Sequence, residues 1–127
     1  MGFKVLVVDD EKDILVLYKL FLTRAGFTVV TAENGLEAFE KISTESPQLV
    51  LSDIRMPIAD GLELLKMIDT LPYSLPVVFI SGYAGLQREA YQSANFKAFY
   101  QKPLKNKELC DIVRSFESLD QSPQHSP

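Results

Sequence analysis

The sequence has little of the features that mark secreted or membrane-spanning proteins. Among its 127 residues there is one cysteine, Cys110, which cannot form an internal disulfide. No apolar run approaches the ~20 residues that a membrane-spanning helix needs, and the first residues do not resemble a signal peptide. These absences favour a cytoplasmic protein that does not enter a membrane.

Basic clusters and histidine are also scarce. The formal net charge is −4, the isoelectric point is near 5.0, and no basic run or stripe is present. Direct nucleic-acid binding is therefore disfavoured, because it needs clustered lysine and arginine to contact phosphates. The single histidine, His125, lies in a polar segment near the end and is not expected to ligate a metal or donate a phosphoryl group.

What is present is the composition of one folded domain. The hydrophobic share is 46% and the charged share is 24%, as in soluble globular proteins. A chain of this length forms one domain around a single core. We expect that domain to span residues 1–119, and we expect the Ser-, Pro- and Gln-rich residues 120–127 to form a flexible tail.

Short apolar runs alternate with amphipathic helical patterns along the chain. The predicted strands are residues 4–8, 27–32, 49–53, 77–80 and 98–101, and a helical pattern follows each of them. Five strands that alternate with five helices predict an α/β fold with a parallel sheet and right-handed crossovers. We expect the doubly wound, flavodoxin-like (βα)5 arrangement, with strand order 2-1-3-4-5.

Polar residues mark the starts of three of these helices. Asn34 stands three residues before Glu37, which is a capping pattern, and Asp60 and Asn106 are the other predicted N-caps. The expected buried stripes are Leu36, Phe39 and Ile42 in the second helix and Leu62, Leu65 and Ile68 in the third. The fourth helix, at about residues 86–94, has a thin apolar stripe and should be the least firmly held.

Polar side chains follow four of the predicted strands, at the point where each strand ends. Asp9 and Asp10 follow the first strand, and Asp53 ends the third. Ser81 follows the fourth strand and Lys102 the fifth. The carboxyl ends of parallel strands share one edge, and the expected order places these four strands side by side. We therefore expect the five side chains to converge.

Such a cluster has the groups that phosphoryl transfer needs. Three close carboxylates raise one another's pKa, and a divalent cation removes that conflict. Oxygen ligands without histidine or cysteine nearby indicate Mg²⁺. Lys102 supplies a positive charge and Ser81 a hydrogen-bond donor, while Asp53 is the candidate nucleophile that would form an acyl phosphate.

These motifs together resemble the receiver domain of two-component response regulators. The resemblance covers about residues 3–119 and rests on four motifs in order: Asp9-Asp10-Glu11, Asp53 with Met56-Pro57 and Asp60-Gly61, Ser81-Gly82, and Lys102-Pro103. An Asp-Asp or Lys-Pro pair alone would mean little. The complete set is highly specific.

The resemblance implies a phosphoacceptor and a metal site. Asp53 would take a phosphoryl group from a histidine kinase or a histidine phosphotransfer protein. Asp10 and Asp53 would bind Mg²⁺ directly, Asp9 would bind it mainly through water, and the backbone carbonyl of Arg55 would complete the protein ligands. The domain would be a signalling module rather than an enzyme, although its own site would promote transfer to Asp53 and hydrolysis from it.

The resemblance also implies a switch. Ser81 would move toward the phosphoryl group, Lys102 would pair with it, and Phe99 would be the aromatic residue that turns inward on activation. The Lys102-Pro103 peptide bond would be cis. Output would reach a downstream effector protein through the fourth helix, the fifth strand and the fifth helix.

Two positions vary within the family that the chain resembles, and a third departs from its usual residue. Arg55 and Tyr83 stand two residues after Asp53 and Ser81, where family members tune the loss of the phosphoryl group. We expect Tyr83, with Arg55, to screen an acyl phosphate from water. Asn95 stands where the family often has glycine, and asparagine tolerates a left-handed backbone.

Two other classes of function remain open. A hydrolase of the haloacid-dehalogenase type would also use an aspartyl nucleophile, but it needs a second acid two residues later, where this chain has Arg55. A receiver fold could instead act as an interaction scaffold without phosphorylation. The presence of every acid, hydroxyl and lysine of the cluster argues against the scaffold.

Overall fold

The computed structural model describes residues 2–82 and 88–120. Within these residues, five parallel strands form one sheet in the order β2-β1-β3-β4-β5. The strands are β1 (Lys4–Val8), β2 (Thr28–Ala32), β3 (Leu49–Ser52), β4 (Val77–Ser81) and β5 (Phe96–Gln101). The helices are α1 (Lys12–Arg24), α2 (Gly35–Glu45), α3 (Gly61–Ile68), α4 (Arg88–Tyr91) and α5 (Asn106–Asp120). The predicted flavodoxin-like fold and strand order are confirmed.

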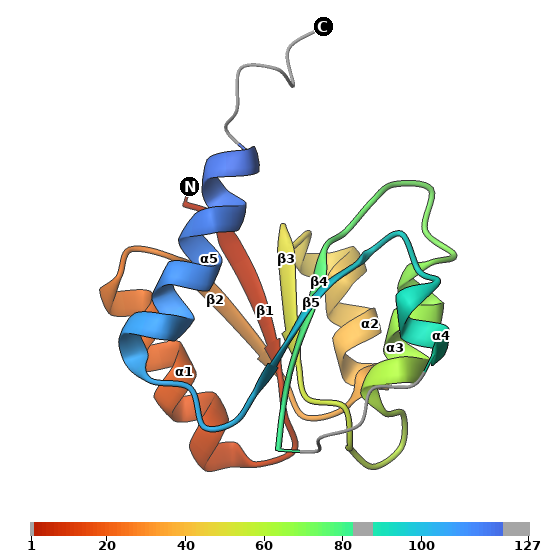
Figure 1. Ribbon diagram of the computed structural model, residues 1–127, viewed down its shortest axis with the longest axis horizontal. Helices are drawn as coiled ribbons and strands as arrows, with labels where there is room; N and C mark the ends of the chain where they lie inside the picture. Colours follow the sequence, from red (N-terminus) through yellow and green to blue (C-terminus); the bar gives the residue numbers. More distant parts are fainter. Residues whose placement is uncertain (1, 83–87, 121–127) are drawn as a thin grey trace, which may run out of the picture.

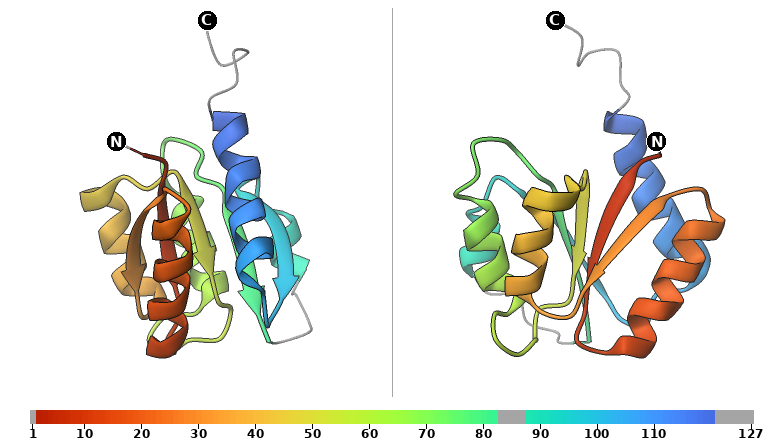
Figure 2. Two further views of the ribbon diagram at one scale, coloured as in Figure 1. Left: turned by 90° about the vertical axis from the view of Figure 1, so that its left-hand side faces the viewer. Right: turned by 180° about the vertical axis from the view of Figure 1, so that it is seen from behind.

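Helices cover both faces of the sheet, with α1 and α5 on one face and α2, α3 and α4 on the other (Figures 1 and 2). Strands in such a sheet are apolar along their whole length, because successive side chains enter opposite cores. In β1, Val5 and Val7 pack with α1 and α5, while Leu6 and Val8 pack with α2 and α3. None of the helices in the described residues is long and apolar enough to cross a membrane.

Two of the three predicted N-caps are confirmed. The side chain of Asn34 accepts the amide of the third residue after it, and Asp60 forms a full capping box at the start of α3. The prediction for Asn106 was wrong by one residue, because Asn106 already lies in α5. The Lys105 carbonyl accepts the first helical hydrogen bond of α5, and the Lys105 amide donates to the Glu108 carboxylate at 3.0 Å.

The prediction of which residues face the sheet was partly wrong for α2 and α3. Leu36 is 48% exposed, and the buried positions of α2 are Gly35, Ala38 and Ile42. In α3, Leu64 is buried beside Leu65 and Ile68, while Leu62 is only partly buried. Gly35 faces inward because the start of α2 packs directly against Ala59, where a Cβ would lie 2.7 Å from the Ala59 carbonyl oxygen. The helical part of the fourth segment is also shorter than predicted, although residues 83–87 lie outside the described residues.

Asn95 does not adopt the left-handed backbone that asparagine tolerates. The non-glycine residues with positive φ, in the part of the chain that the structure describes, are Ser46 and Ile58. Asn95 instead uses its buried side chain to join three elements. Its Oδ1 accepts the Leu75 amide at 2.8 Å, and its Nδ2 donates to the Asp69 carboxylate at 2.9 Å. These bonds tie the end of α3 to the starts of β4 and β5.

We expect Asn95→Ala to lower the free energy of unfolding by about 2 kcal/mol, because the buried Leu75 amide would lose its partner. Urea unfolding followed by circular dichroism would measure the change. Thr70→Ala is the control, since it removes only an exposed hydrogen bond to a backbone carbonyl and should change stability by less than about 0.5 kcal/mol. Equal effects of the two substitutions would contradict the role of Asn95.

Candidate functional site

The carboxyl ends of the strands meet at the lower edge of the sheet in Figure 1. Val8 of β1 and Ser52 of β3 are register partners, so Asp9 and Asp53, which directly follow the two strands, lie level with each other. On the other side of β3, β4 ends at Ser81 and pairs with β5. The Lys102 amide donates to the Ser81 carbonyl at 2.9 Å, which fixes where Lys102 leaves the sheet.

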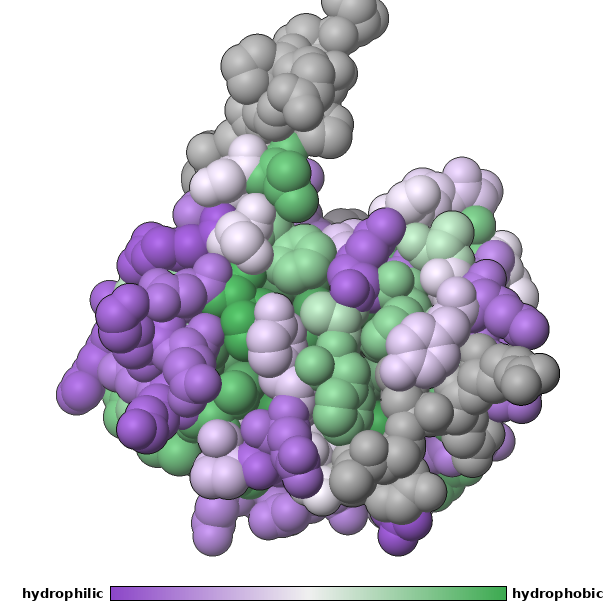
Figure 3. Space-filling model, in the orientation of Figure 1, coloured by the Kyte–Doolittle hydropathy of each residue, from purple (hydrophilic) through white to green (hydrophobic). Residues whose placement is uncertain are grey.

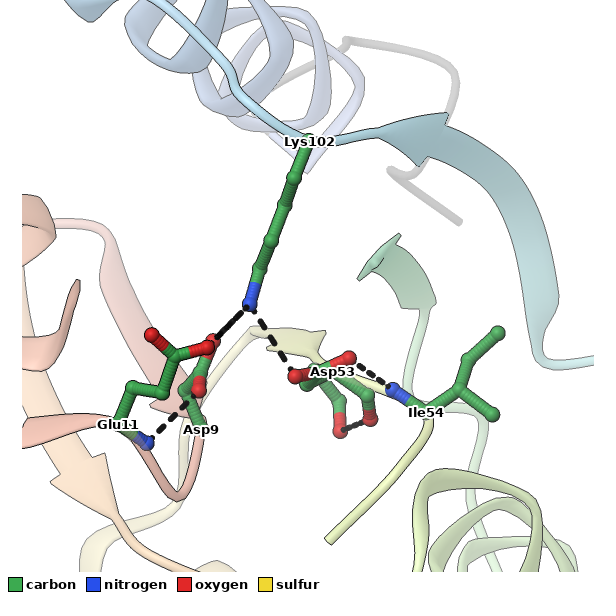
Figure 4. Close-up of polar contacts among 6 residues, drawn as sticks. Asp9, Glu11, Asp53, Ile54 and Lys102 are labelled. Carbon is green, nitrogen blue, oxygen red and sulfur yellow. Dashed lines mark hydrogen bonds and ion pairs between the residues drawn. The ribbon is translucent and has the colours of Figure 1, made fainter. Parts of the chain in front are cut away.

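The Lys102 side chain bridges the two buried carboxylates (Figure 4). Its Nζ lies 2.6 Å from Oδ2 of Asp9 and 3.1 Å from Oδ2 of Asp53. The carboxylate of Glu11 lies farther from the same nitrogen, at 4.0 Å. Asp9, Asp53 and Lys102 come from three strand ends that are distant in the sequence, so the fold itself assembles this cluster.

Asp9 is held from two sides. It is 2% exposed, its Oδ1 accepts the Glu11 amide at 2.9 Å, and its Oδ2 faces Lys102. Burial raises the pKa of the Asp9 carboxyl, and the hydrogen bonds from Lys102 and the Glu11 amide oppose that rise without cancelling it. Burial lowers the pKa of the Lys102 amine, but the carboxylates of Asp9 and Asp53 outweigh it and hold that pKa above its ordinary value.

Asp53 is held by the backbone around it. It is 8% exposed, and its own amide donates to the Val8 carbonyl at 2.9 Å. Its Oδ1 accepts the Ile54 amide at 2.7 Å, while Oδ2 is directed toward Lys102. The carboxylate is therefore fixed in orientation, and its Oδ2 is directed toward the edge of the sheet where Asp9 and Lys102 lie.

The chemistry of the donors fits a hard divalent cation. One carboxylate oxygen from each of Asp9, Asp10 and Asp53 lies within 4.8 Å of the other two. Asp9 and Asp53 are buried and Asp10 is exposed, so the site opens to solvent on one side. Carboxylate oxygens are the ligands that Mg²⁺ prefers, and Mg²⁺ usually retains several waters.

The other predicted site residues lie in different surroundings. Ser81 is 1% exposed at the end of β4, and Phe99 is partly buried on β5 beside its register partner Phe79. Arg55 is exposed in the loop between β3 and α3. The Lys102-Pro103 peptide bond is cis. Tyr83 lies outside the described residues.

Sequence reasoning missed three contributors to the site, two backbone amides and one glycine. The backbone amides of Glu11 and Ile54 orient the two buried carboxylates, and backbone groups carry no signal in a sequence. Gly61 packs its Cα against the Asp53 carbonyl oxygen, where a Cβ would overlap that oxygen. The sequence shows that Gly61 follows the helix cap Asp60, but it does not show that Gly61 contacts Asp53.

Comparison with protein families identifies one family over most of the chain. Residues 5–114 match the response regulator receiver domain. The DNA-binding transcriptional regulator NtrC of Klebsiella pneumoniae is 36% identical over 126 residues, which cover 95% of this chain and 27% of that protein. Sporulation initiation phosphotransferase F of Bacillus subtilis is 29% identical over 94% of this chain and 97% of that protein.

Solved structures show the same similarity. A CheY-like response regulator receiver domain protein from Methanospirillum hungatei superposes with a TM-score of 0.83 at 29% identity, covering 99% of this chain and 100% of that one. The response regulator TrrA from Thermotoga maritima, solved in complex with Mg²⁺ and BeF, gives a TM-score of 0.79 at 30% identity, covering 91% of this chain and 99% of that one.

The length of the match differs among the relatives. This chain spans 34% of the alkaline phosphatase synthesis regulator PhoP of Bacillus subtilis and 23% of NtrC of Escherichia coli. It matches nearly the whole of the sporulation phosphotransferase. The family match over residues 5–114 includes Asp9, Asp10, Asp53 and Lys102 at the edge of the sheet. The chain belongs to the response regulator receiver domain family.

Proposed function

We propose that Asp53 accepts a phosphoryl group and that the domain thereby switches a protein-interaction surface. The observation that carries this proposal is the Lys102 bridge between Asp9 and Asp53. It places a fixed carboxylate oxygen, a positive charge and two further acids at one edge. A buried carboxylate with these neighbours has the surroundings of a nucleophile in phosphoryl transfer.

The chemical step is a displacement at phosphorus. An oxygen of Asp53 forms a bond to the phosphorus atom, and the bond from phosphorus to the nitrogen of a donor phosphohistidine breaks. The imidazole leaves with the electron pair of that bond and takes up a proton. Lys102 would exchange its contact with the free carboxylate for one with the transferred oxygens, where its charge stabilises the transition state.

Asp9, Asp10 and Asp53 would hold Mg²⁺, with the carbonyl of Arg55 as a further proposed ligand. The ion would neutralise charge on the phosphoryl oxygens. The backbone hydrogen bonds of Asp9 and Asp53 matter for this site, because they fix the direction of each carboxylate before any ligand arrives.

We further propose that the donor is a histidine kinase or a histidine phosphotransfer protein and that a downstream effector protein binds the face of α4, β5 and α5. Apolar side chains gather over β5 between α5 and α4 on that face (Figure 3). Tyr91 and Tyr100 are 66% and 38% exposed there. Phe99 lies on the same strand, so an inward turn of its ring would alter this surface. The roles of Arg55 and Tyr83 in screening the phosphoryl group stay predictions.

A receiver that acts as a scaffold without phosphorylation is the alternative function. It needs none of the acids at the sheet edge. Burying two carboxylates and a lysine costs free energy that apolar side chains would not cost, and a scaffold gives no reason to keep them. We therefore favour the phosphoacceptor.

Acetyl phosphate with Mg²⁺ is expected to add the mass of one phosphoryl group to the protein, measured on the intact chain. Chelation of Mg²⁺ should prevent the addition, because the three carboxylates then lack a cation. Asp53→Asn should take up nothing, since an amide is not a nucleophile in this reaction. The proposal fails if the wild type gains no mass, or if the Asp53→Asn variant gains as much as the wild type.

A further inference from the structure

Ile58 is both strained and exposed. Its φ is 70°, in the left-handed region, where a β-branched side chain crowds the backbone. The side chain is 74% exposed, so its burial does not offset that strain. A residue held in this way in the native state is more consistent with a function than with a contribution to stability.

The backbone around Ile58 keeps it in this conformation. The Ala59 amide donates to the Pro57 carbonyl at 2.7 Å, which closes a three-residue turn with Ile58 at its centre. Such a γ-turn with positive φ is rare and strained. The Ala59 carbonyl accepts the Gly35 amide at 2.8 Å, so the start of α2 anchors the turn. The Ile58 side chain is therefore presented to solvent from a rigid base.

This turn lies close to the proposed phosphoacceptor. The loop from Ile54 to Gly61 is closed at its base, because the Gly61 amide donates to the Ile54 carbonyl at 2.7 Å and Gly61 packs against Asp53. Ile58 and Gly61 are three residue steps apart in the chain, a span of at most ~11 Å. In Figure 1 this loop projects from the same edge as the loop between β1 and α1.

A protein that reacts with Asp53 must cover this edge. Asp53 is 8% exposed, so a phosphohistidine reaches it only if the donor protein contacts the loops around it. A standard interface buries about 800 Å² on each partner, which corresponds to a radius of roughly 16 Å. Ile58 falls within that radius of Asp53, and an aliphatic side chain held on a rigid loop can serve as an apolar anchor in an interface.

We propose that Ile58 is a recognition contact for the phosphohistidine-bearing protein that phosphorylates Asp53, and that its side chain packs into an apolar surface of that donor. The inference rests on the proposed function of Asp53. Ile58 would contribute to the binding of a protein donor. It would have no role with small phosphodonors, because its contact lies outside the reacting groups.

The test compares a protein donor with a small one. Ile58→Asn removes the apolar side chain and suits a positive φ, whereas Ile58→Leu keeps an apolar side chain. The histidine kinases of the source organism are autophosphorylated, and the one that phosphorylates the wild type fastest serves as the protein donor. The small donor is acetyl phosphate. We expect Ile58→Asn to slow transfer from the kinase at least tenfold, with uptake from acetyl phosphate unchanged and the thermal midpoint equal or higher. Ile58→Leu should retain transfer.

Tyr73→Asn is the matched control, because Tyr73 is 51% exposed in the loop before β4, at the opposite edge of the sheet. It should change neither rate. Undiminished kinase transfer to Ile58→Asn overturns the inference, as does an equal loss with both donors, which would indicate a distorted site. The inference is also overturned if the wild type self-associates and Ile58→Asn abolishes this association without slowing transfer. Ile58 would then contact a second copy of this chain rather than the donor. A wild type that accepts nothing from acetyl phosphate would instead refute the phosphoacceptor role of Asp53.

Discussion

Lys102→Met is expected to make the stability of this domain depend on Mg²⁺. Methionine keeps most of the aliphatic stem but removes the charge between Asp9 and Asp53, which are 2% and 8% exposed. Removing one partner of a buried ion pair leaves a buried charge without compensation, at a cost of about 3 kcal/mol. In this variant two carboxylates would face each other with no cation between them, and their like charges would repel.

A divalent cation should reverse most of that loss. Mg²⁺ bound by Asp9, Asp10 and Asp53 would supply the missing charge, and binding to the folded state stabilises it by mass action. Urea unfolding of Lys102→Met in EDTA and in excess Mg²⁺ would measure the difference, which should be much larger than in the wild type. The rate of uptake from acetyl phosphate should fall by about 10²-fold even in Mg²⁺, because the charge beside the reacting oxygens is gone.

Lys107→Met is the matched control for Lys102→Met. Lys107 also forms an ion pair, with Asp111 at 2.8 Å, but its side chain is 86% exposed on α5. Water and salt screen such pairs, so this variant should match the wild type in both solutions. If Lys102→Met were as stable in EDTA as in Mg²⁺, the lysine and the metal would not share the same carboxylates, and the assignment of these acids to a metal site would be wrong.

The acids and the lysine of the site could be predicted from the sequence because each follows an apolar strand. The order of strands then fixes which ends are neighbours, and Asp9 and Asp53 lie level because β1 and β3 are in register at Val8 and Ser52. This inference needs only the period of the strands and the topology of the sheet. It does not need the positions of side chains.

The parts that could not be predicted depend on backbone positions. The amides that orient Asp9 and Asp53 belong to Glu11 and Ile54, and any residue other than proline would supply them. The turn at Ile58 contradicts the preference of isoleucine, so local propensity argues against it. The inward face of α2 was misjudged for a related reason. Close packing against Ala59 favours glycine at position 35 on the buried face of α2. An apolar pattern in the sequence instead predicts that larger residues lie on that face.

The same close packing predicts a large effect at Gly61. A Cβ on this residue would overlap the carbonyl oxygen of Asp53 and lie 2.9 Å from both the Ile54 Cα and the Phe79 ring. Two of these three obstacles are backbone atoms, which cannot turn away as a flexible side chain would. Overpacking of a core commonly costs about 1–3 kcal/mol, and we expect Gly61→Ala to reach or exceed the upper end of that range. Urea unfolding would measure the loss.

The substitution should also displace the proposed phosphoacceptor, because the chain must move at Asp53 or at the start of α3 to admit the new methyl group. Uptake from acetyl phosphate by the folded fraction should therefore fall by tenfold or more, as misplacement of a reacting group by about 1 Å has large effects on rate. Gly82→Ala is the control for stability, since no atom of residues 2–82 and 88–120, outside Gly82 and its chain neighbours, lies within 4 Å of a Cβ at Gly82. If Gly61→Ala were as stable and as reactive as the wild type, the contact with Asp53 would not determine where the carboxylate lies. The rigid loop would then contribute nothing to the site.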